Sequence, residues 1–380
     1  MKKTKVLHVV SSMEYGGVQT WLVDLIKEAR PGGIQMDILT YSDRKYPLAE
    51  KAKAYGSRVF VCTNHRHPWA LYRTLRHINR TSGPYTVVHA HNMAQNGMVL
   101  WCAEPLGIPI RISHSHNDTP VPRSKPLRRL YHSLMRFFIF RFGTHLLAGS
   151  SAAGERLYGK GFLTHRACRV LPCGRDFLSL ANDALGVQDT RHALGIPEDA
   201  KVIGHIGRFS HEKNHTFLLD MAAPLLKNHP DFWLILVGDG PLKVQMEAKA
   251  KRLGIASKTL FTGARNEASR LLREVIDVLV FPSHSEGLGL VPLEAQSAGK
   301  PCLLSTAIPS EVDVVPDLIA RLPLEAGIKA WQDALTHLLS SPPALSQDAA
   351  RLKVAHSVFS IERSFSSLRT IYEEAPPRSS

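Results

Sequence analysis

The sequence has 380 residues, of which 44% are hydrophobic and 21% charged, so it is too apolar for a disordered chain and typical of a folded globular protein. At roughly 100–200 residues per domain, this length suggests two or three domains. Lysine and arginine outnumber aspartate and glutamate by 47 to 33, and the net charge of +14 favours a polyanionic partner such as nucleic acid, a phosphorylated ligand or an acidic membrane surface.

The cysteines and the N-terminal residues bear on the cellular compartment. The five cysteines form no CxxC pair, which argues for reduced thiols in the cytosol and against a structural zinc site. The first apolar run, residues 6–10, is short and includes His8, so it is better interpreted as a strand than as a signal peptide. No apolar run approaches the ~20 residues that a membrane span needs. We therefore expect a cytoplasmic protein.

The first half of the chain alternates short β-branched runs with helix-length amphipathic segments. Gly16 and Gly17 end the loop after the first run, and apolar residues then recur at helical spacing. Such alternation predicts a parallel sheet that helices cover on both faces. The predicted strands span residues 6–10, 36–40, 59–62, 86–89, 110–113 and 146–148.

A polar stretch, residues 174–200, carries turn formers and predicts a linker. The apolar runs that follow it do not alternate with polar residues, which again favours a parallel sheet. The predicted strands of this second series span residues 202–206, 233–237, 259–261, 278–281 and 302–304. We therefore expect two doubly wound α/β domains, whose ligands bind at the carboxyl ends of the strands.

The loop after the run 278–281 is the most informative segment. Gly287 and Gly289 allow the backbone to approach a ligand closely, and the N–H groups at the start of the next helix favour an anion. Glu286 and Glu294 bracket the loop with seven residues between them, so both carboxylates could accept hydrogen bonds from the hydroxyls of one sugar ligand. The alternative is that the glycines only form a turn and the glutamates a solvated face.

Two other loops carry candidate phosphate contacts. Arg208 and Lys213 directly follow the first strand of the second series; arginine can hold a phosphate bidentately, and lysine acts as a point charge. Exposed basic residues are usually only solvated, but these two lie at the same predicted sheet edge as Glu286. Gly16 and Gly17 lack the GxGxxG pattern, so they form either a tight β–α turn or a loop that touches a phosphate.

Four motifs together resemble the family 4 retaining glycosyltransferases of GT-B fold. They are the Glu-x7-Glu pair within EGLGLVPLEA, and GRFSHEK, VGDGP and LFTG. The likeness covers nearly the whole chain, and SHSHN at residues 113–117 is similar to the subgroup that builds bacterial exopolysaccharide, capsule and related surface glycans. The resemblance implies an α/β GT-B fold: two doubly wound Rossmann-like domains that face a central cleft. It implies an acceptor domain (1–175), a nucleotide-sugar domain (176–350) and a C-terminal helix (351–375) that crosses back to the first domain.

The resemblance also implies roles for the loops of the second domain. Glu294 would hold the ribose hydroxyls of a nucleotide diphosphate sugar, and Glu286 would contact hydroxyls of the donor sugar. Arg208 and Lys213 would neutralise the diphosphate as it leaves. Arg265 would lie beside the nucleobase. The backbone amides near the phosphates and the sugar would be those of Leu288, Gly289 and Leu290.

By the same resemblance, a histidine of the first domain would lie near the reacting sugar. His114 and His116 are both candidates, and we favour His116 as a catalytic residue with a positioning and electrostatic role. His89 and His91 could support it from the adjacent strand end. The retaining mechanism of this fold is thought to be same-face transfer without a protein nucleophile.

Gly16 and Gly17 would complete the phosphate site when the cleft closes. The family works without a metal ion, and the sequence has no DxD triplet, so we expect no metal and no cofactor beyond the donor itself. We favour a UDP-sugar over a GDP-sugar as that donor. The usual Asn-Gly-Val-Asp turn between the domains is replaced by CGRD at residues 173–176, so contacts from that turn are not carried over.

Residues 123–145 combine six basic residues with a run of aromatic and aliphatic ones, and no acidic residue interrupts them. A basic helix with an aromatic face suits an interfacial membrane helix. We expect this segment to dock the protein on the inner face of the plasma membrane, where it would receive a lipid-linked or oligosaccharide acceptor. The alternative is an ordinary core helix with a basic outer face.

Other functions fit the sequence less well. The basic residues are spread along the chain without a helix-turn-helix, RRM or zinc-finger pattern, which argues against nucleic-acid binding. A phosphorylase should carry a pyridoxal lysine, and an epimerase of this fold should lack the pairing of GRFSHEK with EGLGLVPLEA. A non-catalytic glycan-assembly partner is disfavoured because every expected charged position is filled.

Overall fold

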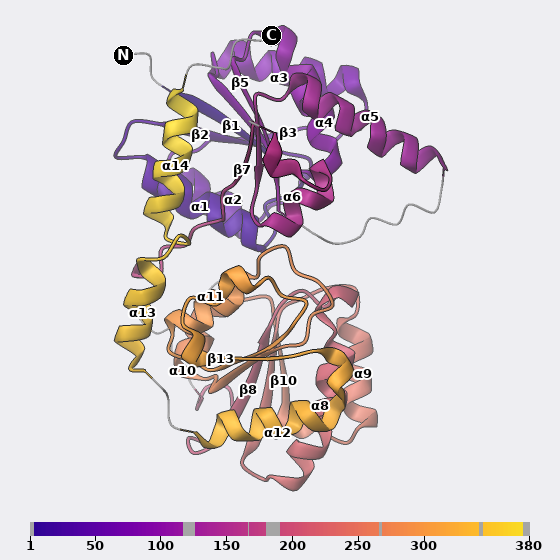
Figure 1. Ribbon diagram of the computed structural model, residues 1–380, viewed down its shortest axis with the longest axis vertical. Helices are drawn as coiled ribbons and strands as arrows, with labels where there is room; N and C mark the ends of the chain where they lie inside the picture. The colour runs from indigo at the N-terminus through magenta and orange to yellow at the C-terminus, as the bar shows by residue number, and fades with distance from the viewer. Residues whose placement is uncertain are drawn as a thin grey trace. The chain divides into compact units, whose positions relative to one another are not determined.

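The computed structural model describes residues 4–116, 126–165, 167–179, 191–265, 268–341 and 345–374. The chain forms two compact units (Figure 1). The first unit holds residues 1–175 and 358–380, and the second holds residues 176–357. Each unit is built around one sheet of its own.

The first unit has a seven-stranded parallel sheet with the strand order β3-β2-β1-β4-β5-β6-β7. Because β1 pairs with β2 along one edge and with β4 along the other, the chain winds outward in both directions from the middle of the sheet. The carboxyl ends of β1 and β4 therefore mark the switch point at which such folds bind ligands. The strands are β1 (Lys5–Val10), β2 (Gln35–Thr40), β3 (Val59–Val61), β4 (Val87–Ala90), β5 (Ile110–Ser115), β6 (His145–Ala148) and β7 (Cys168–Val170).

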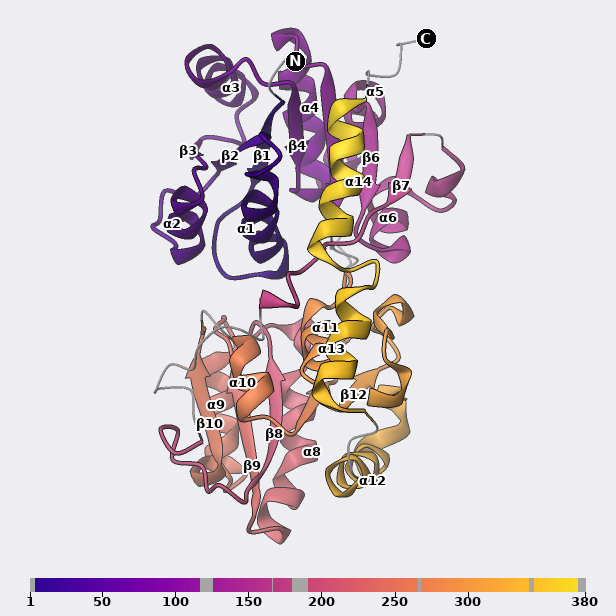
Figure 2. The same cartoon turned by 90° about the vertical axis from the view of Figure 1, so that its left-hand side faces the viewer.

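Helices from both ends of the chain cover this sheet (Figure 2). The last helix, α14, packs against α1, where the indole Nε1 of Trp21 donates a hydrogen bond of 3.0 Å to Ser364 Oγ. Both helices bury a face with the 3.6-residue period of an amphipathic helix. The helices are α1 (Gly17–Ala29), α2 (Pro47–Ala54), α3 (Pro68–Ser82), α4 (Asn96–Ala103), α5 (Pro126–Phe142), α6 (Ser151–Tyr158) and α14 (Ile361–Glu373).

The second unit has a six-stranded parallel sheet with the strand order β10-β9-β8-β11-β12-β13. The strands are β8 (Lys201–Ile206), β9 (Phe232–Val237), β10 (Thr259–Gly263), β11 (Val278–Phe281), β12 (Cys302–Ser305) and β13 (Ile319–Leu322). The helices are α8 (His215–Asn228), α9 (Lys243–Arg252), α10 (Ala268–Glu274), α11 (Leu290–Ser297), α12 (Gly327–Ser340) and α13 (Gln347–Ala355). Among the residues that the structure describes, no helix is long and apolar enough to span a membrane.

The predicted fold class, two doubly wound Rossmann-like α/β domains, is confirmed. Two edge strands were not predicted, because β7 is short with two exposed residues and β13 is only half-buried, so neither has the apolar run of a central strand. The expected C-terminal segment 351–375 contains the end of one helix and the whole of another. The first, α13, packs on α11 in the second unit, and α14 packs on α1 in the first (Figure 2).

Candidate active site

The loop after β8 is held in place by a glycine turn at the same sheet edge. Phe209 N donates to Asp239 O (3.0 Å), and Leu242 N donates to Phe209 O (3.0 Å). Gly238 has a φ of 144°, and a Cβ there would lie 2.0 Å from the carbonyl oxygen of Gly207. The VGDGP motif therefore supplies a turn that only glycine allows to pack directly on the neighbouring backbone.

Lys213 and Glu286 meet at the carboxyl edge of the second sheet, although they come from different loops. The Lys213 ammonium donates to Glu286 Oε1, and Ser283 Oγ donates to the same oxygen at 2.9 Å. The ammonium also lies 4.7 Å from the centroid of the Phe281 ring. The two loops are joined by a backbone hydrogen bond of 2.7 Å from His284 N to Glu212 O. Both partners of the ion pair are largely buried, so the cation and the carboxylate hold each other in one geometry.

The remaining predicted residues of the second unit lie in these two loops or follow β10 and β11 at the same edge of the sheet. Arg208 is exposed, and its guanidinium forms no ion pair with a described carboxylate. Arg265 is half-buried just after β10. Gly289 caps α11 with a left-handed φ of 89° between Leu288 and Leu290.

Glu294 lies on α11, half-buried, and lines a small cavity with Ser269 and Arg273. Of the Glu-x7-Glu pair, Glu286 is joined to the basic loop by Lys213, and Glu294 lies about one turn into α11.

Five histidines line one face of the first sheet at the switch point. Strand register places His8 on β1 opposite His89 on β4, with His91 two residues further on, and His114 and His116 come from the end of β5. Four of the five are buried, and His116 is half-buried. Burial lowers the pKa of all five imidazoles, to about 3 for His8 and for His116. The cluster is therefore neutral at pH 7.

Neutral imidazoles give the first hydrogen-bonded chain a fixed direction. His114 Nε2 lies 3.1 Å from the carbonyl oxygen of Leu171, which can only accept, so this nitrogen carries the proton. His89 Nε2 must then donate to His114 Nδ1 (3.1 Å), and the Tyr372 hydroxyl must donate to His89 Nδ1 (2.9 Å). His114 is thus a fully engaged core residue.

The second chain leads to His116. His8 Nδ1 lies 3.0 Å from His91 Nε2, His91 Nδ1 lies 2.8 Å from His116 Nε2, and His116 Nδ1 lies 3.4 Å from the sulfur of Cys173. His116 is the more accessible of the two candidates, and its ring is held on both sides. Cys173 and Tyr372 were not predicted as members of this cluster, because only the fold brings them to the ends of β4 and β5.

The histidines also form two overlapping triads whose ring nitrogens lie within 4.8 Å of one another, as ligands of a metal ion could. The triads are His8, His89 and His91, and His91, His114 and His116. Every ring nitrogen of the five except His8 Nε2 already has a hydrogen-bond partner, so hydrogen bonding accounts for the arrangement.

Gly16 and Gly17 stand at the exposed N-terminus of α1 in the same unit. Gly16 has an extended φ of −175° and serves as the N-cap without a side-chain hydrogen bond. The first residues of this helix are therefore exposed at the carboxyl end of β1.

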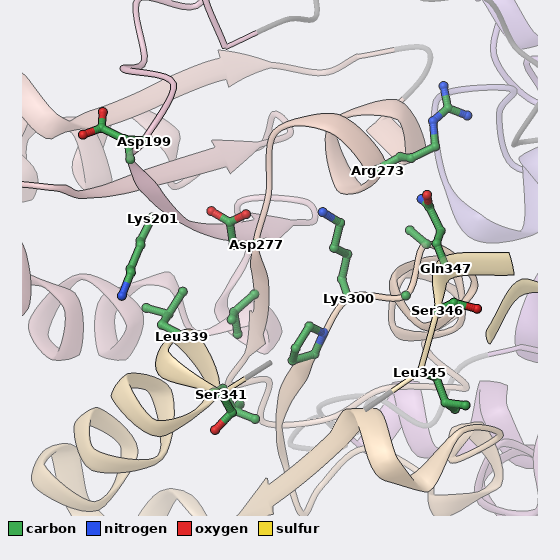
Figure 3. Close-up of a pocket in the computed structure, with 16 residues that line it drawn as sticks. Asp199, Lys201, Arg273, Asp277, Lys300, Leu339, Ser341, Leu345, Ser346 and Gln347 are labelled. Carbon is green, nitrogen blue, oxygen red and sulfur yellow. The ribbon is translucent and has the colours of Figure 1, made fainter. Parts of the chain in front are cut away.

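A cavity of about 710 Å³ in the second unit lies at the other edge of its sheet (Figure 3). Lys201, Asp277 and Lys300 line it, and they mark the amino ends of β8, β11 and β12. None of the predicted site residues lines this cavity. It is thus separate from the candidate site at the carboxyl edge.

Comparison with known proteins identifies the family. The family described as "Glycosyltransferase Family 4" matches residues 15–177, and that described as "Glycosyl transferases group 1" matches residues 187–353. A Bacillus subtilis (strain 168) protein named as the glycosyltransferase EpsF is 34% identical over 333 residues, which cover 87% of this chain and 86% of EpsF.

Two further relatives are informative. An Escherichia coli enzyme named UDP-Gal:alpha-D-GlcNAc-diphosphoundecaprenol alpha-1,3-galactosyltransferase is 26% identical over 58% of each chain. The crystal structure of HepE from Anabaena in complex with UDP-glucose shares the fold, with a TM-score of 0.76 and 19% identity over 96% of this chain and 98% of HepE. The two family matches and the long match to EpsF show that this chain belongs to the family 4, group 1 glycosyltransferases of GT-B type.

Proposed function

We propose that this chain is a metal-independent, retaining hexosyltransferase that moves a sugar from a UDP-sugar to a lipid-linked or glycan acceptor in surface polysaccharide synthesis. The observation that supports it most is the contact between Lys213 and Glu286. It brings a cation suited to a phosphate and a carboxylate suited to sugar hydroxyls to one edge of one sheet. A phosphate group and sugar hydroxyls are the two chemical features that a nucleotide diphosphate sugar would present to this pair.

The basic residues of the β8 loop would stabilise the leaving group. A nucleoside diphosphate gains negative charge as the bond to the sugar breaks, and preorganised cations aimed at that charge lower the barrier. Lys213 is fixed by Glu286 and Phe281, whereas Arg208 is exposed and free to fold over a bound diphosphate. Two cations in these positions would take the part that a metal ion plays in other transferases.

The position of His116 suits a transfer that uses no protein nucleophile. Both of its ring nitrogens are engaged, by His91 and by Cys173, so the ring is oriented and not poised to attack. We assign it a positioning and electrostatic role beside the donor sugar, which the same-face mechanism requires.

The relatives support the choice of substrates. HepE has been solved with UDP-glucose, and the name of the E. coli relative gives UDP-galactose as donor and a sugar on diphosphoundecaprenol as acceptor. We therefore propose a UDP-hexose as donor and an acceptor that is presented at a membrane.

Helix α5 would provide the membrane contact on the cytoplasmic side. Its exposed apolar residues recur at helical spacing: Leu127, Leu130, Leu134 and Phe137. No acidic residue occurs between positions 119 and 154, so the surface complements an anionic bilayer. Arg123 and Lys125, which belong to the predicted segment, lie outside the described residues.

The test is a thermal-shift panel with UDP, GDP, ADP and their sugar conjugates in the presence of EDTA. A ligand that binds only the native state at about 100 times its Kd adds about 2.7 kcal/mol to the free energy of unfolding. We expect UDP and one UDP-hexose to raise Tm in the wild type and in Lys329→Ala, an exposed control, but not in Lys213→Ala. A shift that needs a divalent metal, or one that survives in Lys213→Ala, would contradict the proposed donor site.

The stereochemistry needs a separate measurement. Proton NMR of the product formed from an α-linked UDP-sugar should show an α-glycoside. A β-glycoside would exclude the retaining mechanism, and a donor converted to its epimer without transfer would indicate an epimerase.

A further inference from the structure

A second cavity, of about 240 Å³, lies in the first unit and is lined by three arginines. Arg129 and Arg136 come from α5, and Arg156 comes from α6. His132 and Ser133 of α5 line the same space and add hydrogen-bonding groups. The cavity thus presents guanidinium groups from two helices to one small volume.

Helical spacing explains why these side chains share one wall. Residues three, four and seven positions apart lie on the same face of a helix, as Arg129, His132, Ser133 and Arg136 do on α5. Next to this basic stripe runs the exposed apolar stripe of α5, in which Leu130 is 67% and Phe137 60% exposed. In Figure 1 the N-terminal turns of α5 stand clear of the neighbouring helices. The helix therefore offers cations and apolar side chains along adjoining faces.

The positive charge of the cavity is not neutralised by the lining residues. None of them is acidic, and neither Arg136 nor Arg156 forms an ion pair with a carboxylate of the described chain. Some other arginines of the protein do have a carboxylate partner: Arg58 pairs with Asp37 at 2.7 Å and Arg321 with Asp313 at 2.6 Å. Guanidinium groups gathered without a carboxylate are suited to an anionic ligand.

The cavity lies at the carboxyl edge of the sheet, close in the chain to His116. Met93, in its wall, follows β4 and has a φ of 55°, a strained value for a residue other than glycine. Ser115 Oγ lies 3.7 Å from Met93 Sδ and donates to Ala153 O at 2.7 Å. Since Ser115 immediately precedes His116, the end of β5 connects the arginine cavity to the proposed reaction centre.

We propose that this cavity binds the phosphate or diphosphate group of a lipid-linked acceptor, while the apolar stripe of α5 lies against its hydrocarbon chain. This inference rests on the proposed function and narrows it, because a plain oligosaccharide would offer no anion to Arg136 and Arg156. Each guanidinium can hold two phosphate oxygens, and the two guanidinium groups of Arg136 and Arg156 match the two negative charges of a diphosphate that joins a sugar to a lipid. The lipid phosphate would then fix the position of the acceptor sugar at the carboxyl end of β5, beside His116.

The test uses farnesyl diphosphate, a soluble isoprenoid diphosphate, in the presence of saturating UDP so that the donor site is occupied. Isothermal titration should show binding to the wild type and at least tenfold weaker binding to the double variant Arg136→Gln/Arg156→Gln. The matched control Arg128→Gln/Arg141→Gln removes the same charge from α5 outside the cavity and should bind as the wild type does. The variant Arg156→Lys, which keeps the charge but loses the bidentate geometry, should be intermediate.

Other results would overturn the inference. Equal losses in both double variants would indicate general electrostatic attraction, and equal binding of farnesol would show that only the hydrocarbon is recognised. If the cavity variant lost binding to phosphatidylglycerol vesicles but not to farnesyl diphosphate, the site would take a bilayer headgroup instead. The UDP thermal shift, measured on the same variants, should be the same as in the wild type. If UDP raised Tm in none of the proteins, including the wild type, the proposed function would be refuted, whereas the binding of farnesyl diphosphate to this cavity would not be.

Discussion

At the scale of single residues, the candidate site depends on one shared oxygen. Glu286 Oε1 accepts from both Lys213 and Ser283, so the carboxylate is held at the base of the loop that also starts α11. Because one side chain is fixed by two donors from different segments, its charge orients the lysine as well as itself.

We expect Glu286→Gln to lower kcat by about 100-fold or more, because the amide keeps the shape but removes the charge that holds Lys213 and a donor hydroxyl. Steady-state kinetics with the UDP-hexose found in the thermal-shift panel would measure it. Glu247→Gln, which removes an exposed carboxylate on α9, is the control. A rate near that of the wild type for Glu286→Gln would show that this carboxylate is structural.

At the scale of elements, the VGDGP turn holds the β8 loop in place, and substitution of its glycines tests this role directly. In Gly238→Ala the new Cβ would meet Gly207 O at 2.0 Å, in addition to the strain of a φ of 144°. We expect the free energy of unfolding to fall by more than about 2 kcal/mol and the UDP thermal shift to shrink.

The control for this turn is Gly195→Ala, which also has a positive φ (69°) but no atom within 4 Å of the new Cβ. Denaturant unfolding of both variants separates backbone strain from close approach. If the free energy of unfolding fell equally in both variants, the packing of the turn on the β8 loop would contribute nothing to stability.

The histidine cluster joins three strands, and its burial makes stability depend on pH. In the unfolded chain each histidine titrates near 6.5, whereas in the fold the pKa of His8 and that of His116 are lowered to about 3. Between these values the unfolded state binds more protons, so the free energy of unfolding falls as the pH falls below about 6.5. The slope is about 1.4 kcal/mol per pH unit for each such group.

Urea unfolding at pH 7.5, 6.5 and 5.5 would measure this slope. His8→Gln should reduce the slope by the contribution of one histidine, because glutamine keeps a hydrogen-bonding side chain but does not titrate. A slope that is unchanged by His8→Gln, or stability that rises toward pH 5.5, would contradict the buried neutral state.

At the scale of the whole molecule, the charge excess and the α5 surface predict association with anionic membranes. We expect Leu130→Ser/Phe137→Ser to shift the protein from the pellet to the supernatant when it is sedimented with phosphatidylglycerol vesicles, because the variant loses apolar area that enters the interface. Binding by the wild type should weaken as salt is raised.

The control removes exposed apolar side chains elsewhere, in Val244→Ser/Leu352→Ser. Donor binding should be the same in all three proteins, since none of these residues lies in the β8 or β11 loops. Loss of sedimentation in both double variants would show that α5 has no special part in it.

The fold and the shared sheet edge of the candidate donor residues could be predicted from the sequence because their signals are local. Buried parallel strands appear as continuous apolar runs, and a loop at the carboxyl end of a strand is identified by counting from that run. Lys213 and Glu286 were therefore placed at one sheet edge, and the structure brings them into contact. Strand β13, with its mixed sequence at the sheet edge, has no such signal.

What only the tertiary structure decided are the contacts between distant segments. Five histidines on three strands, with Tyr372 from the last helix and Cys173 after β7, form two hydrogen-bonded chains whose pairing depends on strand register. The arginine cavity likewise needs α5 and α6 side by side. Spacing along the chain determines which residues share one element, so the candidate donor loops could be predicted. The packing of one element on another determines which side chains meet. For that reason the histidine cluster and the arginine cavity could not be predicted.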